Sequence, residues 1–528
     1  MKGGMMAEKE LIFTRRASGL VRELSWWDVF IMLIATPAAS GILYYSVSTA
    51  SSYPGASVPL AFFIGMIMFL PICASIAIVS SIMPRSGSLY ILISRLVNPT
   101  LGYLAGFLFF LGYSLTIGVL GYIIMGIIGG ILTSSGMASN ITGFTNLGIA
   151  LQSRLWRTIG GILWVAFFWL ITLAGVRPFR NILRILFAIP GIATVITIIY
   201  FFFTSPSMAQ LAFNHNWGPG TFQAILNAAK TNGWTAPSFS WSATIGVLLV
   251  VIWAYGGIEM ASYASGEVKT PRRSMIKGFM WGWLGVGLLY IVLACAVYRP
   301  FGGFIGAYDF LYRNHPEVLK EIMPLVSPSV PFYISSIIKN TWIGVIIALA
   351  IALWFVNTMP PFFLGISRLI FAMAMDRAIP ERLANVNPKN GAPTWATHLT
   401  AIVAVIGVIL NMANVKIVLG TITFAVFFPL WLYGLGAMLL PYRRPDIYET
   451  SPIKTKIGGV PIVTIFGFLT FGIGWFIMLF CAREISTPIA IALAVAVVVG
   501  MILYFVQQGR NIKRGIDISK IYSQIPPE

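Results

Sequence analysis

The apolar residues of this chain are gathered into twelve runs, each long enough to cross the hydrocarbon core of a lipid bilayer as a helix. A helix rises about 1.5 Å per residue, so about 20 apolar residues span a core roughly 30 Å thick. Lipid offers no partners to backbone N–H and C=O groups, whereas a helix supplies them from within the run. The runs lie near residues 28–50, 56–82, 100–132, 157–176, 182–204, 241–265, 275–298, 341–372, 395–412, 416–440, 459–482 and 486–507. We therefore predict an all-α polytopic membrane protein with twelve transmembrane helices, in contact with the lipid bilayer.

The placement of basic residues explains the net charge of +19. A charge of this sign can indicate a nucleic-acid partner, but most of the 35 Lys and Arg residues fall in the N-terminal tail and in every second loop. Basic loops next to transmembrane helices stay on the cytoplasmic side. We therefore expect a multi-pass protein of the cell membrane with both termini in the cytoplasm, and no nucleic-acid partner.

The sequence carries no signal for a cofactor, a metal or catalysis. Cys73, Cys295 and Cys481 lie in or beside apolar runs, which is not a disulfide framework, and the three His residues lack metal-ligand spacing. The runs hold no nucleophile paired with a base, and the phosphate-binding pattern G-x-x-x-x-G-K-[ST] does not occur. We expect no resident cofactor or metal, no enzyme and no ATPase domain. The sequence leaves the oligomeric state open.

The stretch from Trp253 to Ser274 interrupts an apolar run in its interior. Gly256 and Gly257 are adjacent there, and Glu259 follows within two residues. Each glycine weakens a helix by roughly 1 kcal/mol, and a carboxyl is costly at that depth. A broken helix and an acid persist together in a membrane only where they face protein or a water-filled cavity. The stretch therefore predicts a binding site in a transporter.

The first apolar run is also interrupted. Pro37 removes a backbone donor, and the small residues 38–41 follow it. For this run alone, a proline kink with small residues for helix packing is the alternative. Two interrupted spans five apart, however, indicate an inverted-repeat transporter. We predict that spans 1 to 5 form one repeat and spans 6 to 10 the other, with helices 1 and 6 discontinuous.

This interpretation divides the chain into a cytoplasmic tail, a five-helix repeat, an extracellular connection, a second five-helix repeat, a loop with helices 11 and 12, and a second cytoplasmic tail. The boundaries, in that order, are 1–24, 25–204, 205–240, 241–440, 441–507 and 508–528. Pro, Trp, Gly and Asn in the long outer connections predict folded caps at 133–155, 205–240 and 300–340. The mixed polar and apolar residues between spans 2 and 3 predict a short interfacial helix.

Four strings of residues resemble the signatures of the amino acid, polyamine and organocation transporter superfamily. The strings are SGI from Ser40, PRSGSLY after span 2, GGIEMASYASGEVKTPRR in span 6, and SRLIFAMAMDRAIPERLANVNPKNGAPTWA from Ser367. They occur in the order that the family shows and cover the first ten spans. The resemblance implies the leucine-transporter fold, a five-plus-five inverted repeat with two trailing helices. It also implies a secondary transporter, a symporter or exchanger, of amino acids or related amines.

The resemblance also implies a substrate site at the two helix breaks. The implied substrate-binding residues are Pro37, Ala39, Ser40, Gly41, Trp253, Gly256 and Phe362. Backbone N–H groups at residues 39–41 would hold the substrate's carboxylate, and carbonyls of Pro37, Trp253 and Gly256 would hold its amino group. A half-helix N-terminus attracts an anion and a C-terminus attracts a cation, which agrees with this assignment. Where the family usually has Gly-Ser-Gly, this chain has Ala39-Ser40-Gly41. This difference narrows the space above the site expected for the substrate's carboxylate.

Two of these assignments have alternatives. Trp253 either stacks on the substrate or is a core residue. Glu259 is the only acid in a span interior and matches a glutamate of some proton-coupled antiporters of the family. It either carries a proton or hydrogen-bonds backbone donors at the helix break.

The coupling mode stays open on the sequence alone. The lysine that some family members place on helix 5 is absent, and Asn357, Thr358 and Ser367 offer oxygen atoms for sodium. Proton coupling, sodium coupling and uncoupled exchange therefore remain alternatives. At the level of function, the alternatives are a channel and a membrane sensor of amino acids that does not transport.

Overall fold

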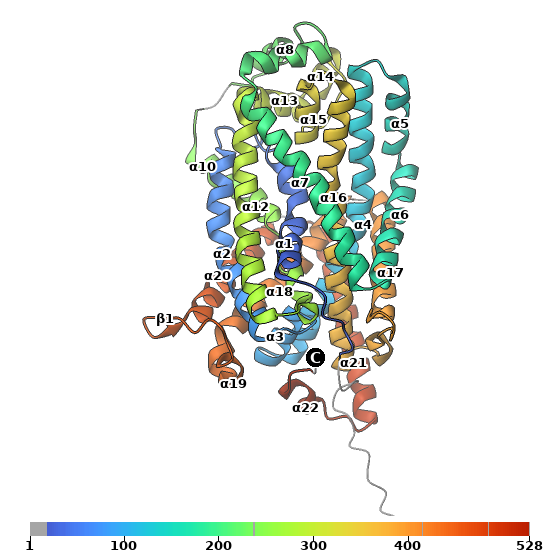
Figure 1. Ribbon diagram of the computed structural model, residues 1–528, viewed down its shortest axis with the longest axis vertical. Helices are drawn as coiled ribbons and strands as arrows, with labels where there is room; N and C mark the ends of the chain where they lie inside the picture. The colour runs from blue at the N-terminus through green and yellow to red at the C-terminus, as the bar shows by residue number, and fades with distance from the viewer. Residues whose placement is uncertain (1–17, 236–237, 414, 484, 527–528) are drawn as a thin grey trace, which may run out of the picture.

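The computed structural model describes residues 18–235, 238–413, 415–483 and 485–526, which fold into a bundle of helices (Figure 1). Ten of the described helices are long and apolar enough to cross a membrane. They are α2 (Val58–Ile82), α4 (Pro99–Ala138), α6 (Arg154–Leu173), α7 (Val176–Phe203), α12 (Pro271–Phe301), α16 (Thr341–Met375), α17 (Thr394–Ala413), α18 (Val415–Arg443), α20 (Ile462–Arg483) and α21 (Thr487–Lys513). Large apolar side chains such as Leu163, Phe203 and Phe505 are exposed on the outside of the bundle. The prediction of a helical, multi-pass membrane protein is confirmed.

The first predicted span stays helical through the predicted interruption. Helix α1 (Trp26–Ser40) contains Pro37 and runs directly into the π-helix η1 (Gly41–Tyr45). Proline removes one backbone hydrogen bond, and a π-helical turn changes the pattern of bonds without opening the chain. The expectation of a discontinuous helix 1 is therefore corrected: its backbone changes from α to π geometry and does not become extended.

The sixth predicted span is interrupted where the sequence places the break. Helix α10 (Trp241–Ala254) ends before the two glycines, and the chain resumes as α11 (Met260–Tyr263) and the short 3₁₀ helix η2 (Ser265–Glu267). Gly257 has φ +95°, a left-handed conformation that residues with a side chain rarely adopt. This glycine thus allows the turn that separates the two helical parts.

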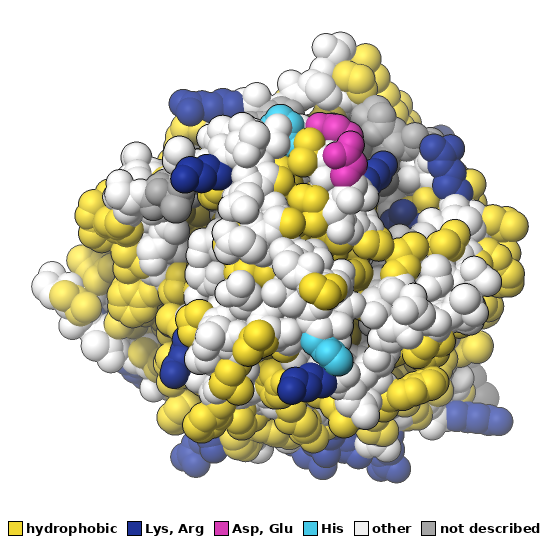
Figure 2. Space-filling view, turned by 90° about the horizontal axis from the view of Figure 1, so that it is seen from above, with side chains coloured by type: hydrophobic (Ala, Val, Ile, Leu, Met, Phe, Trp, Pro, Cys, Tyr) yellow, Lys and Arg dark blue, Asp and Glu magenta, His cyan; other side chains and the backbone are white. Residues whose placement is uncertain are grey.

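Short helices fold over one end of the bundle, which we call the cap end (Figure 1). These helices are α5 (Thr142–Gln152), α8 (Pro206–Trp217), α9 (Thr221–Thr231), α13 (Gly303–Asn314), α14 (Pro316–Ile322) and α15 (Val330–Ile337). They arise from the three connections that the sequence predicts to be folded caps. Figure 2 looks onto this end and shows hydrophobic and uncharged polar side chains, scattered basic side chains and one group of acidic ones. Glu317 and Glu321 of α14 are exposed.

The opposite end, which we call the termini end, carries both ends of the described chain (Figure 1). Its short elements are α3 (Ser88–Leu96), η3 (Glu381–Ala384), α19 (Pro445–Tyr448), the antiparallel hairpin β1 (Lys456–Ile457) and β2 (Val460–Pro461), and α22 (Ile518–Ser523). The predicted helix between spans 2 and 3 is α3. Its side chains from Leu89 to Ile93 are buried. They pack among α4, α16 and α18.

Glycines let α4 approach α17 closely. A Cβ atom added at Gly118 would lie 2.1 Å from the carbonyl oxygen of Ala404 and 2.6 Å from the backbone nitrogen of Val408. Both obstacles are backbone atoms, so no side-chain movement can relieve them. Gly118 therefore serves helix packing.

We predict that Gly118→Ala destabilises the protein by about 1–3 kcal/mol, because the added methyl group forces two helix backbones apart. The matched control is Gly191→Ala in α7, where an added Cβ meets no atom within 4 Å. That change removes a flexible glycine from a helix and should stabilise the protein by up to about 1 kcal/mol. Thermal unfolding of the purified variants in detergent measures both effects. Equal melting temperatures for the two variants would contradict this account of the packing.

Candidate functional site

A cavity of about 170 Å³ lies beside the interrupted span, between α1, α4, α16 and α18. We call it the central cavity. Its lining side chains are aromatic, aliphatic or hydroxyl-bearing, and none of the described ones is charged. They belong to Thr36, Tyr113, Thr116, Val119, Leu120, Ile123, Trp253, Gly256, Gly257, Phe355, Thr358, Phe362, Ile422, Val426 and Phe427.

The turn between α10 and α11 brings main-chain groups to the wall of the central cavity. A Cβ atom at Gly257 would lie 3.3 Å from Thr36 and 3.4 Å from the ring of Phe362. Phe362 in turn meets Tyr113 edge to face, with ring centroids 4.7 Å apart. The sequence-predicted residues Trp253, Gly256 and Phe362 therefore come together here. Their roles toward a substrate stay predictions.

Of the predicted binding residues on helix 1, Pro37 and Gly41 do not belong to the described lining of the cavity. The N–H of Gly41 donates to the carbonyl of Ala38, and the predicted carbonyl of Pro37 accepts a hydrogen bond from the hydroxyl of Tyr290 at 2.7 Å. The side chains of Ala39 and Ser40 lie outside the described part of the structure. The groups assigned to the substrate at Pro37 and Gly41 are thus engaged by the protein itself in this conformation.

Tyr290 of α12 is a residue at the helix breaks that the sequence does not reveal. Its hydroxyl donates to the carbonyls of both Pro37 and Ala254, at 2.7 and 2.8 Å, and so joins helix 1 to the end of α10. A Cβ atom at Gly41 would lie 2.4 Å from the Tyr290 ring, so glycine is needed for this approach. A hydroxyl in the middle of an apolar run is the one signal that could have indicated the residue.

Glu259 lies at the start of α11, buried, with only 4% of its surface exposed. Its carboxyl accepts a hydrogen bond from the hydroxyl of Tyr113, a residue that also lines the central cavity. The acid is therefore one side chain away from the cavity. The hydrogen bond with Tyr113 is compatible with both roles considered for Glu259, proton carrier and structural residue.

The oxygen atoms considered for sodium are used in different ways. Thr358 donates to the carbonyl of Ala35 at 2.9 Å, and Ser367 donates to the carbonyl of Leu364 at 2.9 Å. Neither polar atom of the buried Asn357 amide has a hydrogen-bond partner among the described residues. Within the described ranges, no group of three His, Cys, Asp or Glu side chains is placed to hold a metal ion.

A buried ion pair packs on the termini-end side of Glu259. Arg368 of α16 bonds the carboxylate of Glu267 at 2.6 Å, and both side chains are fully buried. By sequence alone, Glu267 lies in the polar stretch through which span 6 would leave the membrane toward the cytoplasm, whereas in the structure its side chain is buried. A charged residue considered alone is expected to be exposed to solvent, but two opposite charges that bond each other can be buried together.

The chain before α1 and the α3 helix cover the same end. The backbone N–H groups of Glu23 and Leu24 donate to the carbonyl of Glu267, each at 2.9 Å. At the protein surface, a hydrogen bond from Arg177 holds the pKa of the Glu23 carboxyl below its ordinary value. Nearby, Arg95 of α3 forms a second buried ion pair, with Asp376 at the end of α16. These contacts hold the segment before α1, α3 and α16 together at the termini end.

Comparison with known proteins gives a consistent set of similarities. A family model described as amino acid permease matches residues 24–503. The chain is 21% identical to a branched-chain amino acid permease of Bacillus subtilis (strain 168), over 97% of this chain and 99% of that protein. It is 23% identical to a branched-chain amino acid permease of Lactococcus lactis subsp. cremoris (strain MG1363), over 84% and 86%. It is also 26% identical to a cadaverine/lysine antiporter of Escherichia coli (strain K12), over 37% and 40%.

We predict that Arg368→Met destabilises the protein by about 3–5 kcal/mol, because it leaves the Glu267 carboxylate buried without a counter-charge. Replacing both residues by Met should recover much of that loss. The matched control is Arg444→Met, which breaks the exposed pair with Asp446 and should cost less than about 1 kcal/mol. Thermal unfolding of the three variants makes the comparison. If the double variant is no more stable than Arg368→Met alone, the loss of stability does not come from the unpaired Glu267 carboxylate, and the account is contradicted.

Proposed function

The chain belongs to the amino acid permease family, and from this premise we propose that it is a secondary transporter that carries amino acids across the cell membrane by alternating access. The observation that carries the proposal is the central cavity beside the helix break, with the Glu267–Arg368 pair between it and the termini end. Transporters of this kind bind substrate near the middle of the membrane, where discontinuous helices present free backbone groups.

The chemistry of the cavity favours an amino acid with an apolar side chain. Aromatic and branched side chains dominate the wall, and the nearest acid, Glu259, is already bonded to Tyr113. A cationic side chain would lose its hydration there without gaining a counter-charge. The volume of about 170 Å³ suits a small apolar group, since an apolar cavity of about 150 Å³ accommodates benzene. The two branched-chain permeases among the relatives agree with this substrate class.

The charged ends of the substrate would use the backbone near the helix breaks. We keep the assignment of the carboxylate to the N–H groups at residues 39–41, and of the amino group to the carbonyls of Pro37, Trp253 and Gly256. In the conformation described here, Tyr290 occupies the carbonyl of Pro37. Substrate binding at that carbonyl therefore requires the Tyr290 hydroxyl to move away, and the amino group then replaces its hydrogen bond.

The architecture that fits this function has twelve spans in a five-plus-five inverted repeat with two trailing helices. In this proposal, the ten long helices and the segments α1–η1 and α10–α11 are the twelve spans. The proposed repeats cover residues 25–204 and 241–440. The distribution of Lys and Arg along the sequence supports a cytoplasmic termini end and an extracellular cap end.

Reconstitution into liposomes tests the proposed activity. We predict saturable uptake or exchange of L-leucine, L-isoleucine and L-valine, and little uptake of L-lysine or cadaverine. Val119→Phe fills the central cavity and should reduce L-leucine transport at least about tenfold. Val498→Phe is the matched control, because Val498 is 55% exposed on α21 and should leave transport unchanged. Transport of none of these compounds by folded protein would overturn the proposal.

Glu259 provides a separate test of coupling. If it carries a proton, Glu259→Gln keeps the hydrogen bond with Tyr113 but removes the titration. Exchange of L-leucine should then persist, while the pH dependence of uptake and any accumulation driven by a proton gradient should disappear. The measurement is uptake across a range of pH with an imposed gradient. An unchanged pH profile in a stable variant would assign Glu259 a structural role and leave sodium coupling or uncoupled exchange.

A further inference from the structure

A groove runs along the outside of the bundle between α6 and α17, which lie side by side (Figure 1). We call it the outer groove. Its volume is about 690 Å³, and Ile402 and Ile406 on its rim are exposed. Both helices are long and apolar enough to cross a membrane, so the outer groove opens toward lipid. The proposed function gives it no role.

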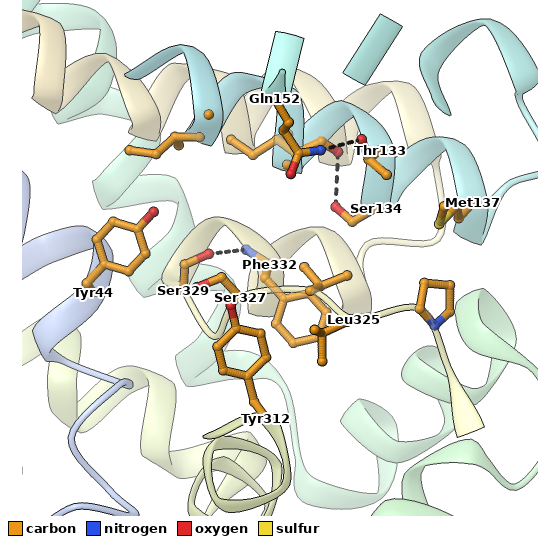
Figure 3. A pocket seen from close by; sticks show the side chains of 16 residues that line it. Tyr44, Thr133, Ser134, Met137, Gln152, Tyr312, Leu325, Ser327, Ser329 and Phe332 are labelled. Atoms are coloured by element: carbon orange, nitrogen blue, oxygen red, sulfur yellow. Dashed lines mark hydrogen bonds between the residues drawn. The ribbon is translucent and has the colours of Figure 1, made fainter. Parts of the chain in front are cut away.

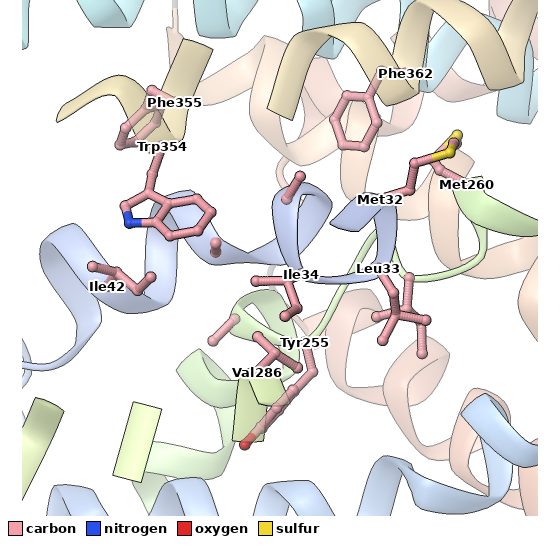
Figure 4. Close-up of a cluster of buried hydrophobic side chains, with 14 of the residues drawn as sticks. Met32, Leu33, Ile34, Ile42, Tyr255, Met260, Val286, Trp354, Phe355 and Phe362 are labelled. Carbon is pink, nitrogen blue, oxygen red and sulfur yellow. The ribbon is translucent and has the colours of Figure 1, made fainter. Parts of the chain in front are cut away.

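The outer groove differs from the spaces inside the protein. Around helix 1 the interior is filled by a cluster of buried side chains that includes Met32 and Trp354 (Figure 4). A pocket at the cap end mixes apolar side chains with polar ones such as Gln152 (Figure 3). In the outer groove, by contrast, the polar side chains lie at one end and the aliphatic ones at the other.

Polarity changes in order along α17, which begins near η3 at the termini end. Trp395 lies in the first turn of α17 and His398 lies one turn further along. The aliphatic lining follows at Ala401, Ile402, Val405 and Ile406. These positions are three or four residues apart and therefore share one face of the helix. From His398 to Ile406 the helix advances about 12 Å, less than half of a core about 30 Å thick, so the groove lies within one leaflet.

His398 supplies a hydrogen-bond donor to the wall of the outer groove. The indole N–H of Trp169 on α6 donates to the Nδ1 atom of His398 at 3.0 Å. A neutral imidazole whose Nδ1 accepts a hydrogen bond carries its proton on Nε2. No described residue bonds that second nitrogen. The Nε2–H group is therefore left for an acceptor on a ligand, such as a carbonyl oxygen.

The end of the groove next to η3 is positively charged. Arg382 of η3 is exposed, and its guanidinium carbon lies 3.9 Å from the centroid of the Trp395 ring, on which it stacks. The neighbouring carboxylate of Glu381 is already paired with Arg377 and Arg514, at 3.7 and 3.2 Å. Three guanidinium groups thus lie around one carboxylate. An anionic group at this end of the groove would find a charge-assisted hydrogen-bond donor in Arg382.

We propose that the outer groove is a binding site for one anionic phospholipid. The phosphate contacts Arg382, an ester carbonyl accepts the hydrogen bond from His398, and an acyl chain lies along the aliphatic lining of α6 and α17. A phospholipid carries its charge, its esters and its hydrocarbon in that order, which is the order of the groups along the wall. A headgroup with its own ammonium group gains less, because that ammonium meets the same cations.

The position of the site in the membrane agrees with this ligand. In the orientation proposed above, the termini end is cytoplasmic, and the lipid would belong to the cytoplasmic leaflet. That leaflet carries the anionic lipids that basic residues next to a membrane attract. The inference goes beyond the proposed function and does not depend on what the protein transports.

Three substitutions test the three contacts separately. Arg382→Gln removes the charge, and His398→Phe removes the donor but keeps a ring. Ala166→Phe places a ring in the groove, because Ala166 lines it and is half-buried. The matched controls are Arg273→Gln, at an exposed position of α12, and Ala494→Phe, at an exposed position of α21, since neither residue lines the groove.

The experiment counts the lipids bound to the purified, delipidated full-length protein by native mass spectrometry after addition of dioleoyl-phosphatidylglycerol or dioleoyl-phosphatidylcholine. The wild type and both controls should retain one phosphatidylglycerol per chain, with a preference of about fivefold over phosphatidylcholine. Arg382→Gln should lose this preference, and Arg382→Lys should keep it. His398→Phe should weaken the binding of both lipids alike, and Ala166→Phe should retain neither.

Two results would overturn the inference. Equal retention of the two lipids by the wild type, or an unchanged preference in Arg382→Gln, would make the groove an ordinary lipid-facing surface. Retention by Ala166→Phe equal to that of the wild type would place the bound lipid elsewhere. If Ala166→Phe does not fold, Arg382→Gln decides, because it changes an exposed side chain. No transport is measured, so either result leaves the proposed function standing.

Discussion

A helix broken inside a membrane leaves backbone groups that lipid cannot satisfy, and the rest of this structure depends on how those groups find partners. At the end of α10, the carbonyl of Ala254 accepts a hydrogen bond from Tyr290, and the same hydroxyl serves Pro37 on helix 1. One side chain therefore holds both perturbed helices together. Because one of its bonds goes to the Pro37 carbonyl, which we assign to the amino group of the substrate, this contact competes with the proposed substrate.

The same requirement explains the two ends of the bundle. Charges at the termini end are buried as pairs, with Arg368 on Glu267 and Arg95 on Asp376, so each ion is compensated away from water. At the cap end, the contact between Tyr44 and Phe355 is aromatic and involves few groups. Opening the termini end would require these buried charges to separate.

The sequence predicts those parts of the fold that follow from local chemistry. Apolar length gives the spans, and the pair Gly256-Gly257 gives the break in the sixth span, because only glycine adopts the required backbone conformation freely. Helix 1 is less predictable: the same residues that indicate an interruption can be accommodated by a π turn, and the choice depends on packing against Tyr290. Arg368 and Glu267 illustrate the general limit. Each can be buried because the other, 101 positions away in the chain, supplies the opposite charge. The residues next to either one in the sequence do not indicate this pairing.

The central claim is that an amino acid binds between the helix-6 break and α16 and displaces the Tyr290 hydroxyl. The most direct measurement is an electron cryo-microscopy structure of the full-length protein with L-leucine in a lipid nanodisc. The account predicts density for leucine in the cavity formed by Trp253, Gly257 and Phe362, with its amino group at the carbonyl of Pro37 and the Tyr290 hydroxyl withdrawn from that carbonyl. Leucine bound elsewhere while the central cavity stays empty, or bound in the cavity with the Tyr290 bonds intact, would contradict it.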